Sequence, residues 1–131
     1  MAAVLLDSTV LIDLLRARPE TVGRLETLRA RGDIPFTCAV NVEEVRRGLR
    51  PGEEEMAGAL FAGLREAPLG IEEGRRAGAW RRDFARRGRT LAQGDCLIAA
   101  AALGVDARLA TGNPKDFPIR GIVVEHWPVG Q

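Results

Sequence analysis

The sequence predicts an α/β domain of three layers, with a central, mostly parallel sheet of about five strands flanked by helices. Short apolar segments alternate with longer stretches of helical periodicity, which is the pattern of repeated strand-helix units. Hydrophobic residues make up 46% of the chain and aromatic residues only 5%, so we expect a mainly aliphatic core. The length of 131 residues fits one domain, and residues 1–131 are expected to form it.

The first third of the chain contains two strands and two helices. Residues 3–6 are an apolar run that ends at Asp7, which predicts the first strand. Apolar residues then recur at helical spacing, and helices are expected at residues 9–17 and 20–31. Residues 34–37 contain isoleucine, phenylalanine and threonine, which favour the second strand.

The middle of the chain is predicted to be largely helical. Helices are expected at residues 42–49, 53–65 and 72–87. Three consecutive glutamates begin the second of these helices, where they complement the positive end of its dipole. A weaker strand is expected near residues 68–71, between the last two helices.

The last third returns to the strand-helix alternation. An alanine-rich apolar stretch predicts a helix at residues 95–103, and Gly104 follows it at a position typical of a helix end. Residues 107–111 and 122–125 are expected to form the remaining strands.

Positive charge is concentrated in one helix although the net charge is only +1. Residues 75–89 contain seven arginines and one aspartate. Such a stretch attracts phosphate groups, and a solvated helix face is the simpler explanation. The low aromatic content argues against base stacking as the main mode of binding nucleic acid.

Cysteine usage and hydropathy indicate a cytoplasmic protein with no membrane partner. Cys38 and Cys96 form no close-spaced metal or redox motif and stand among apolar residues, so buried thiols are expected. The first apolar run ends at Asp7, which does not fit a signal peptide. The uncharged stretch 96–105 is too short to span a bilayer.

Polar side chains recur where strand-like segments lead into helices. These junctions lie at Asp7 and at residues 41–44, 94–95 and 113–116. Taken singly, each reads as a helix cap; Asn41, for example, precedes a glutamate by three residues. Taken together, they would meet at one edge of a parallel sheet, where ligands bind in open α/β folds.

Carboxylates gathered at one edge need protons or a cation to offset their repulsion. Oxygen ligands without clustered histidine or cysteine favour Mg²⁺ or Mn²⁺ over zinc. His126 is the only histidine, so acid-base chemistry by two histidines is unavailable within one chain. The pattern therefore predicts metal-assisted hydrolysis.

Four blocks carry these residues in order along the chain, at residues 4–13, 42–48, 94–103 and 109–117. Together they resemble the PIN domain, and most closely its VapC toxin branch. The resemblance spans nearly the whole sequence. It implies a compact α/β fold and a Mg²⁺- or Mn²⁺-dependent ribonuclease that leaves a 5′-phosphate and a 3′-hydroxyl.

The resemblance also implies the site residues. Asp7, Glu44 and Asp95 match three acids of the family, and the fourth position falls on Asn113 or on Asp116 three residues later. Our hypothesis is that Asp7 and Asp95 bind the metal directly, while Glu44 and Asp116 orient or deprotonate water. Supporting or substrate-binding roles are expected for five residues: Ser8, Thr9, Asn113, Arg46 and Arg47.

Similarity to VapC implies an RNA substrate, a VapB-type antitoxin that blocks the site, and a homodimer. Met56, Leu60 and Leu64 recur at helical spacing and would suit the wall of a groove for an amphipathic partner segment. The simpler interpretation of this stripe is core.

Other functions predict different residues. A haloacid-dehalogenase-like phosphatase expects a second acid two residues after the first, where Thr9 stands. A receiver domain expects an acidic pair after the first strand, but Ser8 follows Asp7. Two PIN alternatives remain, a nuclease of ordinary RNA processing and a catalytically inactive binding module; the presence of Asp7, Glu44 and Asp95 argues against the second.

Overall fold

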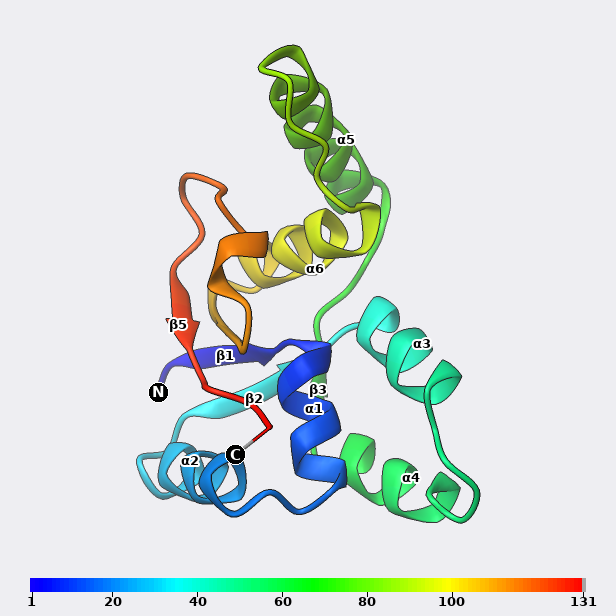
Figure 1. The fold of residues 1–131 in the computed structure, drawn as a ribbon. Helices are drawn as coiled ribbons and strands as arrows, with labels where there is room; N and C mark the ends of the chain where they lie inside the picture. Colours follow the sequence, from blue (N-terminus) through cyan, green and yellow to red (C-terminus); the bar gives the residue numbers. More distant parts are fainter. Residues whose placement is uncertain (131) are drawn as a thin grey trace.

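A computed structural model describes residues 1–130 and shows a five-stranded, fully parallel sheet between two layers of helices (Figure 1). The sheet has the order β3-β2-β1-β4-β5, so β1 lies at its centre between β2 and β4. The strands are β1 (Ala3–Leu6), β2 (Ile34–Thr37), β3 (Arg65–Glu66), β4 (Ala107–Thr111) and β5 (Val124–His126). All five therefore direct their carboxyl ends to the same edge.

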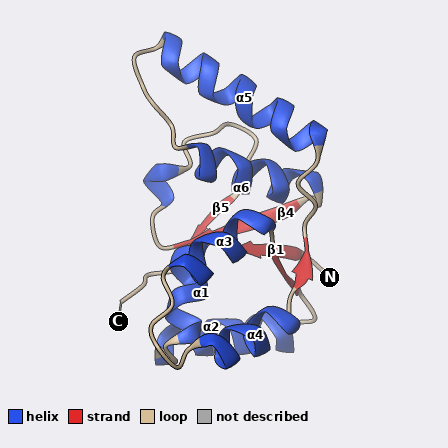
Figure 2. Cartoon of the chain, turned by 90° about the vertical axis from the view of Figure 1, so that its right-hand side faces the viewer, coloured by secondary structure: helices blue, strands red, loops and turns tan. Residues whose placement is uncertain are grey.

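The helices cover both faces of the sheet. They are α1 (Ser8–Leu15), α2 (Pro19–Ala30), α3 (Ala39–Arg47), α4 (Glu54–Ala62), α5 (Ile71–Arg86) and α6 (Gln93–Gly104), followed by a short 3₁₀ helix, η1 (Pro114–Asp116). Figure 2 shows α1, α2 and α4 on one side of the sheet, with α6 on the other and α5 lying over α6. This is the predicted three-layer arrangement.

The central strand supplies both halves of the core. Val4 and Leu6 join one hydrophobic cluster with α1 and α2, while Leu5 joins the other with α6. This division follows from the two-residue side-chain period of a strand. Because α6 lies between the sheet and α5, its residues from Ile98 to Ala102 are fully buried. Asp7, which follows β1, and Asp95, which lies in the first turn of α6, are thus held by well-packed elements.

Three of the five strand predictions are confirmed at their predicted residues, and two differ. The strand expected near residues 68–71 is wrong; β3 lies earlier, at Arg65–Glu66, because α4 ends at Ala62. Residues 68–70 instead lead to Gly70, the N-cap of α5. The last strand begins at Val124, since a turn with Gly121 at positive φ precedes it.

The six predicted helices are present, with shifted ends. The largest shifts are of three residues: α3 begins at Ala39 instead of residue 42, with Cys38 as its N-cap, and α4 ends at Ala62 instead of residue 65. Helix α1 ends at Leu15, and Ala17 just beyond it adopts a positive φ of 54°. None of the helices in the described residues is long and apolar enough to cross a membrane. Cys38 and Cys96 are buried free thiols, as predicted.

Candidate active site

The structure brings four acids into electrostatic contact at the carboxyl edge of the sheet. Asp7 follows β1, Glu44 lies in α3, Asp95 lies in the first turn of α6, and Asp116 ends η1 after β4. Burial and, in decreasing order, the negative charges of Asp116, Asp7 and Glu44 together raise the pKa of Asp95 from 3.8 to about 6. Segments far apart in the sequence therefore share one acidic site.

Two threonine hydroxyls hold Asp7 in place. Its side chain is 5% exposed, and Oδ2 accepts hydrogen bonds from Thr111 Oγ1 at 2.7 Å and Thr9 Oγ1 at 3.1 Å. Each hydroxyl oxygen accepts a backbone N–H in turn, Thr9 from Gly112 and Thr111 from Asn113, both at 3.0 Å. Burial raises the pKa of Asp7 and these hydroxyls oppose the rise. The end of β4 and the two residues after it thereby fix the carboxylate that follows β1.

A chain of hydrogen bonds orients Glu44. Ser8 Oγ donates to Glu44 Oε1 at 2.6 Å, and Asn41 Nδ2 donates to Ser8 Oγ at 3.1 Å. Asn41 Oδ1 accepts from the Cys38 backbone N–H at 3.2 Å. The second carboxylate oxygen, Oε2, lies only 3.0 Å from the position that a Cβ at Gly94 would take. Gly94 therefore allows the Glu44 carboxylate to approach the start of α6.

The acids are not simple helix caps. Asp7 is the N-cap residue of α1, yet its side chain makes no capping hydrogen bond. Asp95 lies inside α6, whose N-cap is Ala92. Asn41, expected as a cap, is the third residue of α3 and is completely buried, because it bridges Cys38 and Ser8. The carboxylates of Asp7 and Asp95 thus remain available for chemistry.

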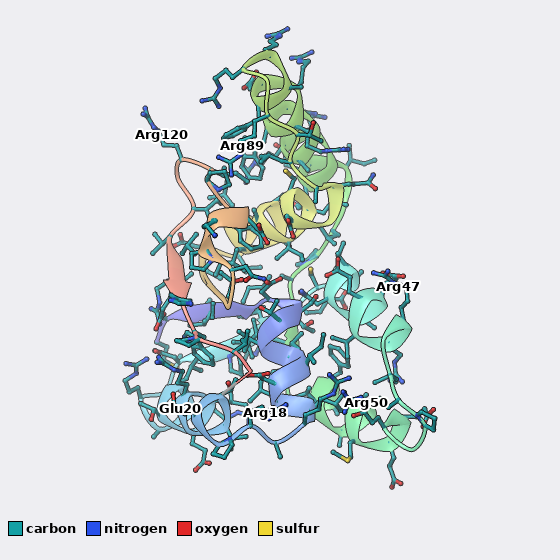
Figure 3. The ribbon with its side chains drawn as sticks, in the orientation of Figure 1. Arg18, Glu20, Arg47, Arg50, Arg89 and Arg120 are labelled. Carbon is teal, nitrogen blue, oxygen red and sulfur yellow. The ribbon has the colours of Figure 1, made fainter. Side chains whose placement is uncertain are left out.

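The other predicted residues occupy more exposed positions. Asn113 and Asp116 are exposed, and the Asp116 N–H donates to the Asn113 carbonyl at 3.0 Å. Arg47 pairs with Glu43 at 3.2 Å, and Figure 3 shows its side chain directed outward. The Arg46 guanidinium lies near Gly58 of α4. These two arginines make no hydrogen bond or ion pair to the four acids in residues 1–130.

Sequence reasoning missed three residues that position the acids: Thr111, Asn41 in its bridging role, and Gly94. Thr111 ends a strand that a parallel sheet would place beside β1, so its position was readable once the strand order was known. Gly94 directly precedes a predicted acid, which is a weak sign of close approach. Nothing in the sequence alone pairs Asn41 with Ser8.

The carboxylate oxygens of the four acids are ligands of the type that a hard divalent cation prefers. Within residues 1–130, no three histidine, cysteine, aspartate or glutamate side chains are grouped closely enough to hold one ion together as they stand. The four acids are coupled by charge, and each offers oxygen donors of the kind that Mg²⁺ and Mn²⁺ take. A cation between them would offset the repulsion that raises the pKa of Asp95.

A parallel sheet with acids at its carboxyl edge is the arrangement of a PIN domain. The profile of the PIN domain family matches residues 4–118, and the chain belongs to this family.

Two relatives come from Mycobacterium tuberculosis. "Ribonuclease VapC10" is 36% identical over 117 residues, which cover 88% of this chain and 86% of that protein. "Ribonuclease VapC19" is 30% identical over 115 residues, covering 88% and 92%. The matches therefore extend over most of both proteins.

Solved structures of toxin-antitoxin complexes share the fold. VapBC2 from Rickettsia felis, bound to a DNA fragment from its promoter, aligns with a TM-score of 0.84 at 20% identity over 95% of this chain and 98% of the other. DNA-bound VapBC from Salmonella typhimurium aligns with a TM-score of 0.80 at 22% identity, over 97% and 99%. At these identities the likeness establishes the fold.

Proposed function

We propose that this protein is a divalent-metal-dependent endoribonuclease that acts as the toxin of a VapBC toxin-antitoxin system. The placement of Asp7, Glu44, Asp95 and Asp116 at the carboxyl edge of the sheet carries the proposal, because ligands bind at this edge in parallel α/β sheets; the raised pKa of Asp95 supports it. Membership of the PIN family and relatives named as ribonucleases support it. The proposal treats residues 1–131 as one PIN domain.

In this proposal Asp7 and Asp95 hold Mg²⁺ or Mn²⁺, and Glu44 and Asp116 orient or deprotonate water. When bound, such an ion makes hydroxide available near neutral pH and offsets charge on a phosphoryl oxygen. Ser8 donates to Glu44 Oε1, which leaves Oε2 free to accept a proton from the attacking water. Thr9 acts through Asp7, whose Oδ2 it keeps in place.

The water gives one proton to Glu44 as its oxygen attacks phosphorus in line, the bond to the 3′-oxygen breaks, and that oxygen takes up a proton from solvent. The products are a 5′-phosphate and a 3′-hydroxyl. The exposed Asn113 amide is suited to hold a water or a phosphate oxygen. Arg46 and Arg47, which form no ion pair with the four acids within residues 1–130, attract the RNA backbone by their charge.

A VapB-type antitoxin is the proposed inhibitor, and a second copy of the chain the proposed homodimer partner. A hollow of about 430 Å³ between α3 and α4 is lined in part by Val42, Phe61 and Leu64, which suits an apolar anchor of the antitoxin. Met56 on α4 is 53% exposed, while Leu60 packs against the core. A cytoplasmic site of action belongs to the same proposal.

The test is cleavage of pooled total RNA by the purified protein, with Mg²⁺ or Mn²⁺ and with chelator. We expect cleavage only with metal, and loss of at least about a hundredfold in rate for Asp95→Asn. Asp106→Asn is the matched control, because Asp106 is exposed and at a positive φ that asparagine also tolerates. Metal-dependent cleavage that survives Asp95→Asn would refute the assignment, and no cleavage by folded protein would favour an inactive binding module.

A further inference from the structure

A hollow outside the acidic site lies between the second half of α5 and the segment that follows η1. Its volume is about 360 Å³. In Figure 3, Arg89 lies near α5, and Arg120 extends from the tip of the neighbouring loop. The lining includes Trp80, Asp83, Phe84 and Arg87 on α5 or its end, with Ile119 and Arg120 opposite.

Flat side chains and positive charges meet in this hollow. The Arg87 guanidinium carbon lies 4.2 Å from the centroid of the Phe84 ring, so Phe84 supports the cation from one side. Ile119 belongs to the core cluster beneath, and the partly buried Trp80 packs against that cluster, so the floor is apolar. Arg87 and Arg120 are exposed cations at its rim.

Arg89 connects the wall of the hollow to the backbone beside Asp116. Arg89 packs over Phe84 at 5.9 Å and donates from Nη2 to the Lys115 carbonyl at 3.1 Å. Lys115 precedes Asp116, whose charge acts on Asp95. One short stretch of chain therefore links the hollow to the acids. A nucleotide seated in the hollow would have its phosphates close to η1.

We propose that this hollow binds one base of a single-stranded RNA substrate beside the cut site, with a preference for guanine; this rests on the proposed nuclease function. The base stacks on the Arg87 guanidinium and on Trp80, as unpaired bases do on arginine and aromatic planes. Arg120 and Arg89 neutralise the adjoining phosphates. A single stacked base agrees with the low aromatic content, which argues only against stacking as the main mode of binding nucleic acid.

The guanine preference comes from Asp83. Among residues 1–130 it is the only acid lining the hollow, and its ion pair with Arg86 is long, at 3.9 Å. An ionised carboxylate only accepts hydrogen bonds. Guanine places two neighbouring N–H donors on its Watson–Crick edge, whereas adenine, cytosine and uracil each place an acceptor beside a donor. A carboxylate therefore matches guanine and opposes the other three.

The experiment measures binding of two short labelled RNAs by fluorescence anisotropy, one all uridine and one with a single guanosine. All proteins carry Asp95→Asn to prevent cleavage. Arg87→Gln should weaken binding of the guanosine RNA at least about fivefold. Arg18→Gln, an exposed arginine at the far end of the molecule, should change it less than about twofold (Figure 3). Asp83→Asn should abolish the preference for guanosine without weakening uridine binding.

Two results would overturn the proposal: a guanosine preference unchanged by Asp83→Asn, or equal effects of Arg87→Gln and Arg18→Gln. Arg87 and Asp83 are exposed, so folding is expected to survive, and thermal melting checks it. Cleavage of total RNA by the wild-type protein, with Asp95 intact, separates the base-site hypothesis from the nuclease hypothesis. If that protein cuts RNA while the preference test fails, only the base site is wrong; if it neither cuts nor binds, the nuclease function is wrong as well.

Discussion

The acidic edge of the sheet and helix α5 carry charge in opposite ways. At the edge, Asp7 is nearly buried and hydrogen-bonded to two hydroxyls. On α5, Arg75 and Arg86 are 71% and 69% exposed, and their acidic partners lie one turn away on the same helix. Exposed pairs of this kind contribute little to stability, whereas a buried carboxylate that loses a donor is costly. We therefore expect function to depend on exact geometry at the acidic edge and on net charge along α5.

Of the variants that compare these two regions, Thr111→Val should reduce the cleavage rate most, because it removes the shorter hydrogen bond to Asp7. We expect the cleavage rate to fall about 10- to 100-fold, as for other residues that orient a metal ligand. Thr21→Val is the matched control, because Thr21 is also fully buried and donates to an aspartate, Asp13, at 3.0 Å. Both variants should lose about 2 kcal/mol of stability. Equal activity in the two variants would remove the positioning role of Thr111.

Gly94→Ala should separate activity from stability. The added Cβ would stand 3.0 Å from Glu44 Oε2, so the carboxylate must move, and we expect a loss of about tenfold in rate. Melting temperature should not fall, since alanine favours a helix more than glycine. Gly78→Ala on α5 meets no atom within 4 Å and should leave the rate unchanged. Steady-state kinetics and calorimetry on both variants decide the matter.

Substitutions on helix α5 should change the salt dependence of RNA binding. Replacing exposed Arg82 and Arg86 by glutamine should weaken RNA binding severalfold and reduce the slope of log K against log salt by about 0.7 per arginine. The control pair is Arg18 and Arg50, which Figure 3 places at the opposite end of the molecule. Titrations at several salt concentrations measure both slopes. Identical slopes would show that α5 does not face RNA.

The smallest effect is a gain in stability for Asp95→Asn in chelator. Because the folded pKa of Asp95 is raised from 3.8 to about 6, the ionised carboxylate disfavours folding above pH 6. We expect the variant to be more stable by about 1 kcal/mol at pH 7, after allowance for solvent screening. This gain should shrink as pH falls from 6 to 4, where the folded carboxyl is protonated. Unfolding curves at pH 7 and pH 4 test the sign of this stability difference.

The same contrast explains what the sequence could predict. Strands β1, β2 and β4 and the acids at their ends follow from local patterns, since burial on both faces requires apolar runs and the chain must then turn. The strand β3 escaped prediction because two exposed, charged residues on a sheet edge carry no apolar signal. The hydrogen bonds to Asp7 and Glu44 could not be predicted, because they depend on the assembled strand order.

The hydrogen bond from Thr111 to Asp7 joins residues 104 positions apart and bears on how the protein is made. Strand β4 pairs with β1 and carries Thr111, so Asp7 lacks the shorter of its two hydroxyl hydrogen bonds until the last quarter of the chain has been translated and folded. Domains fold as units during synthesis, and long-range parallel pairing is slow. A ribosome that is still building this chain therefore carries an inert product, and truncation before Thr111 would release a polypeptide without the assembled site.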